Sequence, residues 1–288
     1  PPIAIISLIF VSLFLVSLGL DKSSNPKLST LTSKKKRSVN QGNARKDSPT
    51  ANVLEVNNLT VEFEKEGGKI TALNQISLEI PENRIVGLIG ESGSGKSTLA
   101  NAILAILPEN GFVANGNIIF NNKFMGDLSD QEINKLRANE MSLIPQAAMN
   151  SLNPVLKIKD QLLDSVAFQE KDSVLKNQRI VQLLNQVGLD GNVADKYQHQ
   201  LSGGMKQRVT MAMAISHKPK LLIADEPTSA LDVVVQKKVM KTLKTIQQNL
   251  KCGMILIGHD LGLITQFCDD VVVLYEGRIV EFGSVKEI

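Results

Sequence analysis

Apolar and polar positions from residue 51 onward follow two alternating patterns. VLEVNNLTVEF (53–63) and ISLEI (76–80) alternate apolar with polar residues, which predicts half-buried antiparallel strands. Short apolar runs predict buried central strands at 84–90, 221–225, 254–258 and 271–275. Apolar residues at helical spacing predict helices at 97–107, up to Pro108, and over most of 127–217. The segment EGRIVEFG (276–283) predicts a turn and a final strand. This order predicts an α/β fold with a mostly parallel sheet, an antiparallel β subdomain and a helical subdomain at about 127–217.

The first 20 residues show neither pattern. IAIISLIFVSLFLVSLGL (3–20) is uncharged and apolar, long enough for a bilayer-spanning helix. A buried core helix is one alternative, but the run has no polar face; a signal peptide is another, but a basic start and a cleavage site are lacking. We therefore expect a transmembrane helix at 1–20, a basic flexible linker at 21–50 and a folded domain at 51–288. The basic cluster places the downstream domain on the cytoplasmic side.

Charge and composition narrow the class of partner. Residues 21–47 hold eight Lys/Arg against Asp21 and Asp47, whereas the whole chain has a net charge of only +3, so the domain itself is mildly acidic. Tryptophan is absent and aromatic residues make up 4% of the chain. These features argue against a basic or aromatic nucleic-acid surface. Cys252 and Cys268 form no metal-ligand pattern, and we expect reduced thiols.

GESGSGKS, from Gly90 to Ser97, lies between a predicted buried strand and a predicted helix. Its glycines let the backbone curl until several N–H groups converge on phosphates. Lys96 adds a positive charge for the β- and γ-phosphates, and the Ser97 hydroxyl suits magnesium. The segment predicts an ATP site with Mg²⁺ as cofactor. Its predicted nucleotide-binding residues are Gly90, Glu91, Ser92, Gly93, Ser94, Gly95, Lys96, Ser97 and Thr98.

LLIADE (221–226) is an apolar strand that ends in two carboxylates. In an open α/β sheet, ligands bind beyond the carboxyl ends of the strands. A strand that ends this way is by itself more often the start of a solvated loop. Together with the phosphate loop it indicates catalysis, with Asp225 holding magnesium through water and Glu226 polarising the attacking water.

LSGGMKQR (201–208) lies between these two motifs. Alone, Ser202 would be only a helix cap. In this order the motifs make residues 53–284 resemble the ABC ATPase family. The resemblance implies that Ser202, Gly203 and Gly204 bind the γ-phosphate of ATP held by an opposite subunit.

Other positions acquire roles through the same resemblance. Gln146 matches a glutamine that senses magnesium and couples to the membrane partner, and His259 matches a switch histidine at the γ-phosphate. Asp232, in SALD (229–232), matches the family's loop that crosses the dimer interface. Phe63 is the candidate for stacking on adenine, although a core role fits its alternating strand equally well.

SLNPVLKIKDQL (151–162), LSGGMKQRVTMAMAI and ADEPTSALDVVVQ resemble the ATP-binding subunits of oligopeptide and dipeptide importers, a branch shared by nickel and some oligosaccharide importers. The chain departs from that branch by lacking a Pro-containing carboxyl-terminal extension and by carrying the apolar segment. LFLVSLGLDKSSNPKLS resembles the end of a matching permease subunit, which suggests a permease fused to its ATPase.

The resemblance implies an ATP-hydrolysing subunit that powers solute import at the cell membrane. The implied partners are a second ABC ATPase subunit, identical or related, transmembrane permease subunits and an extracytoplasmic solute-binding protein. One alternative is a soluble ABC ATPase acting on DNA or ribosomes, but such proteins usually carry two cassettes or a long coiled-coil insertion. The other is a non-hydrolysing regulatory half, which the intact Glu226 and His259 disfavour. The transported solute is not encoded in the ATPase.

Overall fold

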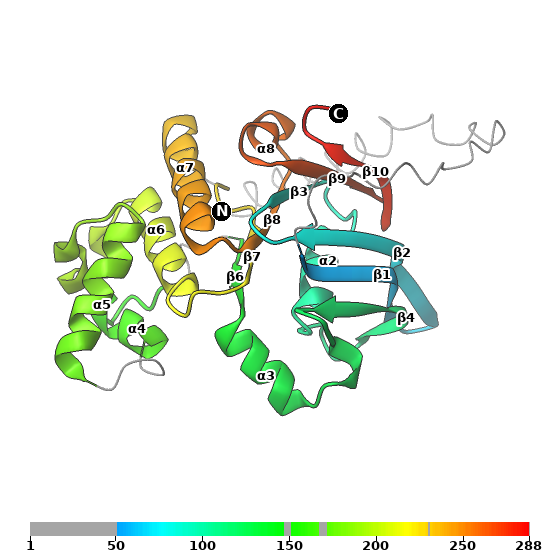
Figure 1. Ribbon diagram of the computed structural model, residues 1–288, viewed down its shortest axis with the longest axis horizontal. Helices are drawn as coiled ribbons and strands as arrows, with labels where there is room; N and C mark the ends of the chain where they lie inside the picture. Colours follow the sequence, from blue (N-terminus) through cyan, green and yellow to red (C-terminus); the bar gives the residue numbers. More distant parts are fainter. Residues whose placement is uncertain (1–50, 147–150, 167–171, 230, 288) are drawn as a thin grey trace, which may run out of the picture. The chain divides into compact units, whose positions relative to one another are not determined.

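The computed structural model describes residues 51–146, 151–166, 172–229 and 231–287 (Figure 1). They belong to one unit, Thr50–Ile288. The predicted transmembrane helix at 1–20 and the linker at 21–50 lie outside the described residues. Within the described part, no helix combines the length and apolar character needed to cross a membrane.

The alternating segments form an antiparallel sheet, as predicted. Its strand order is β2-β1-β4-β5, and the strands are β1 (Asn52–Lys65), β2 (Gly68–Pro81), β4 (Gly111–Phe120) and β5 (Lys123–Phe124). Every pairing in this sheet is antiparallel. In β1, the apolar side chains of Leu54, Val56 and Val61 are buried, so the sheet covers one side of the core.

The continuous apolar runs form a six-stranded sheet in the order β10-β9-β3-β8-β7-β6. All neighbours are parallel except the edge strand β10 against β9. The strands are β3 (Ile85–Ile89), β6 (Met141–Ile144), β7 (Leu221–Asp225), β8 (Gly253–Gly258), β9 (Asp270–Tyr275) and β10 (Arg278–Ser284). In β7, Leu222 and Ala224 face one core, whereas Leu221 and Ile223 face the other. Burial on both faces explains why these strands carry no polar alternation.

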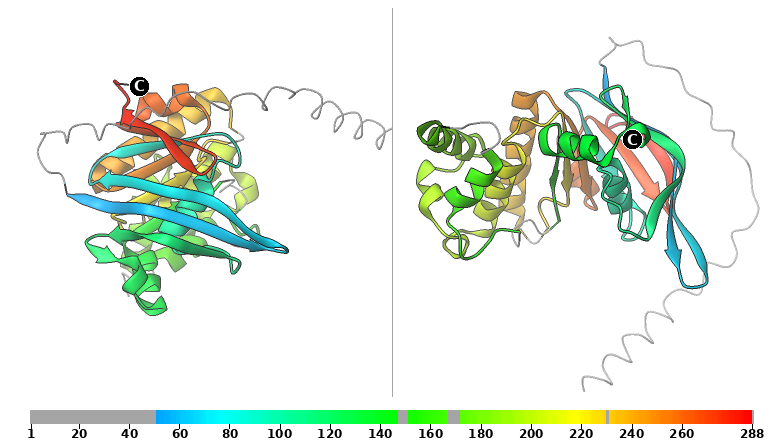
Figure 2. Two further views of the ribbon diagram at one scale, coloured as in Figure 1. Left: turned by 90° about the vertical axis from the view of Figure 1, so that its right-hand side faces the viewer. Right: turned by 90° about the horizontal axis from the view of Figure 1, so that it is seen from below.

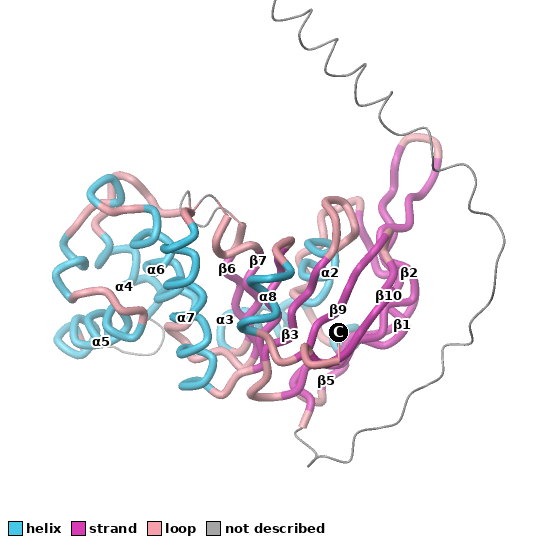
Figure 3. Tube along the Cα trace, turned by 90° about the horizontal axis from the view of Figure 1, so that it is seen from above, coloured by secondary structure: helices cyan, strands magenta, loops and turns pink. Residues whose placement is uncertain are grey.

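Helices cover the parallel sheet and extend away from it (Figures 1 and 2). They are α2 (Lys96–Ile103), α3 (Asp130–Asn139), α4 (Ile158–Val166), α5 (Ser173–Gln186), α6 (Gly203–Ala214), α7 (Val233–Leu250) and α8 (Leu261–Phe267). Short 3-10 turns are η1 (Met125–Asp127), η3 (Gly191–Asp195) and η4 (Gln198–Gln200). Figure 3 shows α4, α5 and α6 grouped together, away from β1 and β2.

Two sequence-based boundaries need correction. The range 127–217 contains β6, a buried strand of the parallel sheet, and α3 lies outside the α4–α6 group, so the helical subdomain begins only after β6. The helix predicted over 97–107 ends at Ile103. Ala105 has a left-handed φ of 53°, and the amides of Ala105 and Ile106 donate to the carbonyls of Ala102 and Asn101. This Schellman closure, rather than Pro108, stops the helix.

Candidate active site

The phosphate-loop segment connects the end of β3 to the start of α2. Gly95 is the N-cap of α2 with φ 106°, a conformation that side chains rarely adopt. At Gly90, a Cβ atom would lie 2.2 Å from the carbonyl oxygen of Leu274, so this position leaves no room for a side chain. The glycines therefore allow the tight path, as the sequence predicts.

Lys96 is tied to its own loop. Its Nζ donates to the carbonyl oxygens of Gly90 and Glu91, each at 2.7 Å, and the residue is only 8% exposed. An ammonium has three donors, so one remains for a bound anion. Gly90 and Glu91 thus serve the site through main-chain oxygens. The buried Ser94 hydroxyl has no hydrogen-bond partner among the described residues.

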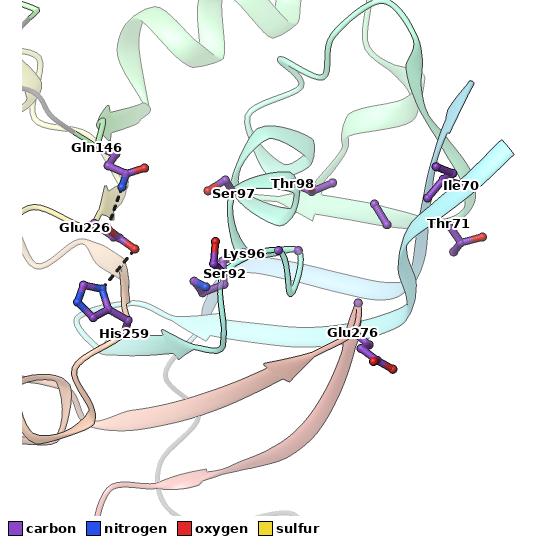
Figure 4. A pocket seen from close by; sticks show the side chains of 14 residues that line it. Ile70, Thr71, Ser92, Lys96, Ser97, Thr98, Gln146, Glu226, His259 and Glu276 are labelled. Atoms are coloured by element: carbon purple, nitrogen blue, oxygen red, sulfur yellow. Dashed lines mark hydrogen bonds and ion pairs between the residues drawn. The ribbon is translucent and has the colours of Figure 1, made fainter. Parts of the chain in front are cut away.

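Side chains from three strand ends converge beside this loop (Figure 4). Gln146 follows β6, Glu226 follows β7 and His259 follows β8. Gln146 Nε2 donates to Glu226 Oε2 at 2.9 Å, and His259 Nδ1 lies 3.5 Å from Glu226 Oε1. Ser97 Oγ donates to Asp225 Oδ2 at 3.2 Å. The parallel sheet thereby gathers residues that lie up to 162 positions apart, as for Ser97 and His259.

Glu226 has an unusual backbone for a residue other than glycine. Its φ is 44°, and its amide donates to the carbonyl of Ile257 on the neighbouring strand at 3.0 Å. Strained backbone of this kind persists only where the surroundings hold it, and it is typical of functional sites. The turn directs the carboxylate to Gln146 and His259, with the Glu226 side chain 20% exposed.

Asp225 is electrostatically distinct from Glu226. Burial raises the pKa of the Asp225 carboxyl, and the hydrogen bond from Ser97 partly offsets that effect. The neighbouring Glu226 raises the pKa further, whereas Lys96 lowers it. A partly buried carboxylate next to a hydroxyl oxygen offers the hard oxygen ligands that Mg²⁺ prefers, and a cation there would stabilise the charged form.

A pocket of about 620 Å³ joins these groups. One end holds Gln146, Glu226 and His259, the phosphate loop forms the middle, and Ile70, Thr71 and Glu276 lie at the other end (Figure 4). From the phosphate loop, the lining includes Ser92, Gly93, Gly95, Lys96, Ser97 and Thr98. Sequence reasoning missed Ile70, Thr71, Ala72, Glu276 and Gly277, because strand β2 and a hairpin turn carry no nucleotide motif.

The segment LSGGMKQR (201–208), here called the signature segment, is not part of this pocket lining. Ser202 is the N-cap of α6, and its hydroxyl accepts from the Met205 amide at 3.3 Å. Gly204 packs so closely on α7 that a Cβ would lie 2.5 Å from Val235 Cγ1. Asp232 caps α7 by accepting from the amides of Val234 and Val235. These groups are placed on helix starts outside the chain's own pocket.

Phe63 is likewise absent from the pocket lining. It is partly buried, packs against the core beneath the antiparallel sheet, and sits so close to Gly111 that a Cβ there would lie 2.7 Å from its ring. Ile70, its partner in the β1–β2 register, lines the pocket. Directly paired residues share one face of a sheet, so the stacking of Phe63 on adenine stays a prediction beside its packing at Gly111.

Comparison with known proteins gives a consistent result. The model of the ABC transporter family matches residues 73–229. The oligopeptide transport ATP-binding protein OppD of Haemophilus influenzae is 40% identical over 246 residues, which cover 82% of this chain and 74% of that protein. The dipeptide transport ATP-binding protein DppD of Bacillus subtilis is 39% identical over 240 residues, covering 82% of this chain and 72% of that protein.

A solved structure shares the fold. A dimeric ATP-binding cassette in a post-hydrolysis state, bound to ADP and Pi, superposes with a TM-score of 0.71 at 27% identity, covering 81% of this chain and 98% of that one. Since the family model spans more than half of the chain and the relatives match at about 40% identity, the chain belongs to the ABC transporter family of ATP-binding cassettes.

Proposed function

We propose that this chain is the ATP-hydrolysing subunit of an importer for oligopeptides or dipeptides. The observation that carries hydrolysis is the Glu226 carboxylate, held by Gln146 and facing His259 beside the phosphate loop. Support for peptide import comes from the relatives, which are named for oligopeptide and dipeptide transport.

In this proposal Lys96 and the loop amides hold the β- and γ-phosphates, and Glu226 orients the water that attacks the γ-phosphate. The hydrogen bond from Gln146 fixes the carboxylate, leaving it to accept from the water. His259, whose side chain is 72% exposed, contacts the γ-phosphate from the open side of the pocket.

Mg²⁺ would be held by Ser97, Asp225 and Gln146. The residues fit, because Ser97 Oγ and Asp225 Oδ2 lie 3.2 Å apart. Glu226 accepts from the Gln146 amide nitrogen, which leaves the Gln146 amide oxygen to bind the cation. Bound there, the cation would neutralise charge on the phosphates. The chain's own contribution is to orient these oxygens at one edge of the sheet.

Two cassettes would close around two ATP molecules. The Ser202-Gly203-Gly204 turn begins α6 and lies outside its own pocket, and the N–H groups at a helix start suit an anion. It would therefore meet the γ-phosphate in the opposite subunit, with Asp232 at the interface. A γ-phosphate that bridges two subunits gives ATP its preference for the closed state.

Permease subunits in the membrane and an extracytoplasmic solute-binding protein would complete the transporter, with the cassette on the cytoplasmic side. The 1–20 segment would add a membrane anchor of its own. Coupling would run through Gln146 and the following 151–157 loop, where Val155 is 75% exposed. An apolar side chain so exposed suits a protein partner.

Uptake of a radiolabelled tripeptide tests the proposal. Cells of the source organism that lack this chain should lose uptake, and the wild-type chain, but not Glu226→Gln, should restore it. Uptake of a labelled free amino acid is the control and should not change. Tripeptide uptake that survives without the chain would refute peptide import.

A further inference from the structure

The end of the pocket that holds Ile70 and Thr71 carries a carboxylate to which the proposed hydrolysis gives no role. Glu276 lines the pocket together with Ile70 and Thr71, on the side of the phosphate loop away from Glu226 (Figure 4). Among the described residues, no hydrogen bond or ion pair engages the Glu276 side chain.

Glu276 sits in a turn that does not favour its side chain. Tyr275 pairs with Arg278, so Glu276 and Gly277 are the two loop residues of the β9–β10 hairpin. Their φ values are 44° and 72°. Turns with two positive φ values favour Asn, Asp or Gly at the first position. A glutamate held there indicates a use for its longer carboxylate beyond forming the turn.

The turn is fixed relative to the phosphate loop. The Gly277 amide donates to the Ser94 carbonyl at 2.9 Å, and the Gly277 carbonyl accepts from the Asn74 amide at 2.8 Å. A Cβ at Gly277 would lie 2.4 Å from the Ala72 carbonyl oxygen, so the turn lies directly against β2. Gly277 thus contacts the phosphate loop through Ser94, and this contact fixes the position of the preceding residue, Glu276.

We propose that Glu276 is a specificity-determining residue that accepts a hydrogen bond from the ribose hydroxyls of the bound nucleotide. Along ATP, the ribose follows directly after the phosphates, and its 2′- and 3′-hydroxyls are donors that a carboxylate can accept. Phosphate oxygens would repel the same carboxylate. Ile70 provides apolar surface further along, where the base would lie. The inference rests on the proposed function, because it assumes that ATP occupies this pocket.

Nucleotide analogues provide the test. Calorimetry on the 288-residue chain, with magnesium, would compare ATP, 2′-deoxyATP and 3′-deoxyATP. In the wild type, at least one deoxy analogue should bind about tenfold more weakly than ATP, the order expected for one hydrogen bond to a charged acceptor. In Glu276→Ala, ATP should bind only as well as that analogue.

Two further variants keep the result interpretable. Glu276→Asn suits the turn but has a shorter side chain, so it should preserve the fold and also lose discrimination. Lys96→Ala should weaken all three nucleotides by the same factor and keep their ratio. Equal discrimination in Glu276→Ala and wild type, or none in wild type, would overturn the ribose contact alone. If the wild type binds none of the three nucleotides, the proposed ATPase function itself fails.

Discussion

Lys96 allows a quantitative test, because its ammonium both braces the phosphate loop and faces the pocket. Without nucleotide, Lys96→Met removes two hydrogen bonds of 2.7 Å but keeps the aliphatic stem. Hydrogen bonds to charged groups contribute about 1.5–3 kcal/mol each, and sharing one donor group reduces the sum, so we expect a loss of about 2–4 kcal/mol. Lys96→Ala also removes buried methylenes, each worth about 0.8 kcal/mol when fully buried, and should be less stable still.

Urea unfolding with and without ATP and magnesium separates the two roles. For the wild type, ATP at 100 times its dissociation constant should add about 2.7 kcal/mol to the free energy of unfolding. Both Lys96 variants should gain almost nothing at that concentration. If the free energy of unfolding of Lys96→Met without nucleotide stays within about 0.5 kcal/mol of wild type, as for an exposed substitution, Lys96 does not brace the loop. Undiminished stabilisation by ATP would refute the role in phosphate binding.

Three further outcomes follow from the site. Glu226→Gln should bind ATP normally but lose at least about 100-fold in turnover, whereas Glu281→Gln on the exposed edge strand β10 should hydrolyse at the wild-type rate; similar rates for both variants would contradict the assignment. Asp225→Asn should lose magnesium-dependent turnover without losing nucleotide-free stability at neutral pH. Since burial raises the Asp225 pKa in the fold, the wild type should gain stability relative to this variant as pH falls through that pKa. Urea unfolding at a series of pH values measures this difference, and a wild type that loses stability relative to the variant at low pH would contradict it. With ATP and magnesium, Glu226→Gln should dimerise in light scattering, while adding Ser202→Arg should leave a monomer that still binds ATP.

The residues of the phosphate loop and the β7 carboxylates could be predicted from sequence because their chemistry is local. A loop that must curl around phosphate needs glycine where a side chain would collide, as at Gly90 with the Leu274 carbonyl. Likewise, a strand that delivers Asp225 and Glu226 to the sheet edge needs a continuous apolar run. Both requirements produce a contiguous sequence motif.

The end of helix α2 and the packing of Phe63 have no contiguous sequence motif of this kind. Helix α2 ends at Ile103 through a left-handed Ala105, a choice of backbone conformation that the apolar spacing cannot reveal. The packing of Phe63 against Gly111 depends on the pairing of β1 with β4, which an alternating strand does not record.

By itself, the sequence determined an α/β fold with a glycine-rich loop before a helix and an apolar strand that ends at Asp225, because each rests on a local pattern of residues. The cassette family and the role of Ser202 followed from the resemblance of the motifs taken together. Only the tertiary structure decided that Gln146 and His259 lie next to Glu226, and that Glu276 lines the same pocket as Ile70. These contacts depend on strand order, on hairpin register and on the close approach of Gly277 to β2. Such relations arise between distant segments when they pack, so no single stretch of the chain records them.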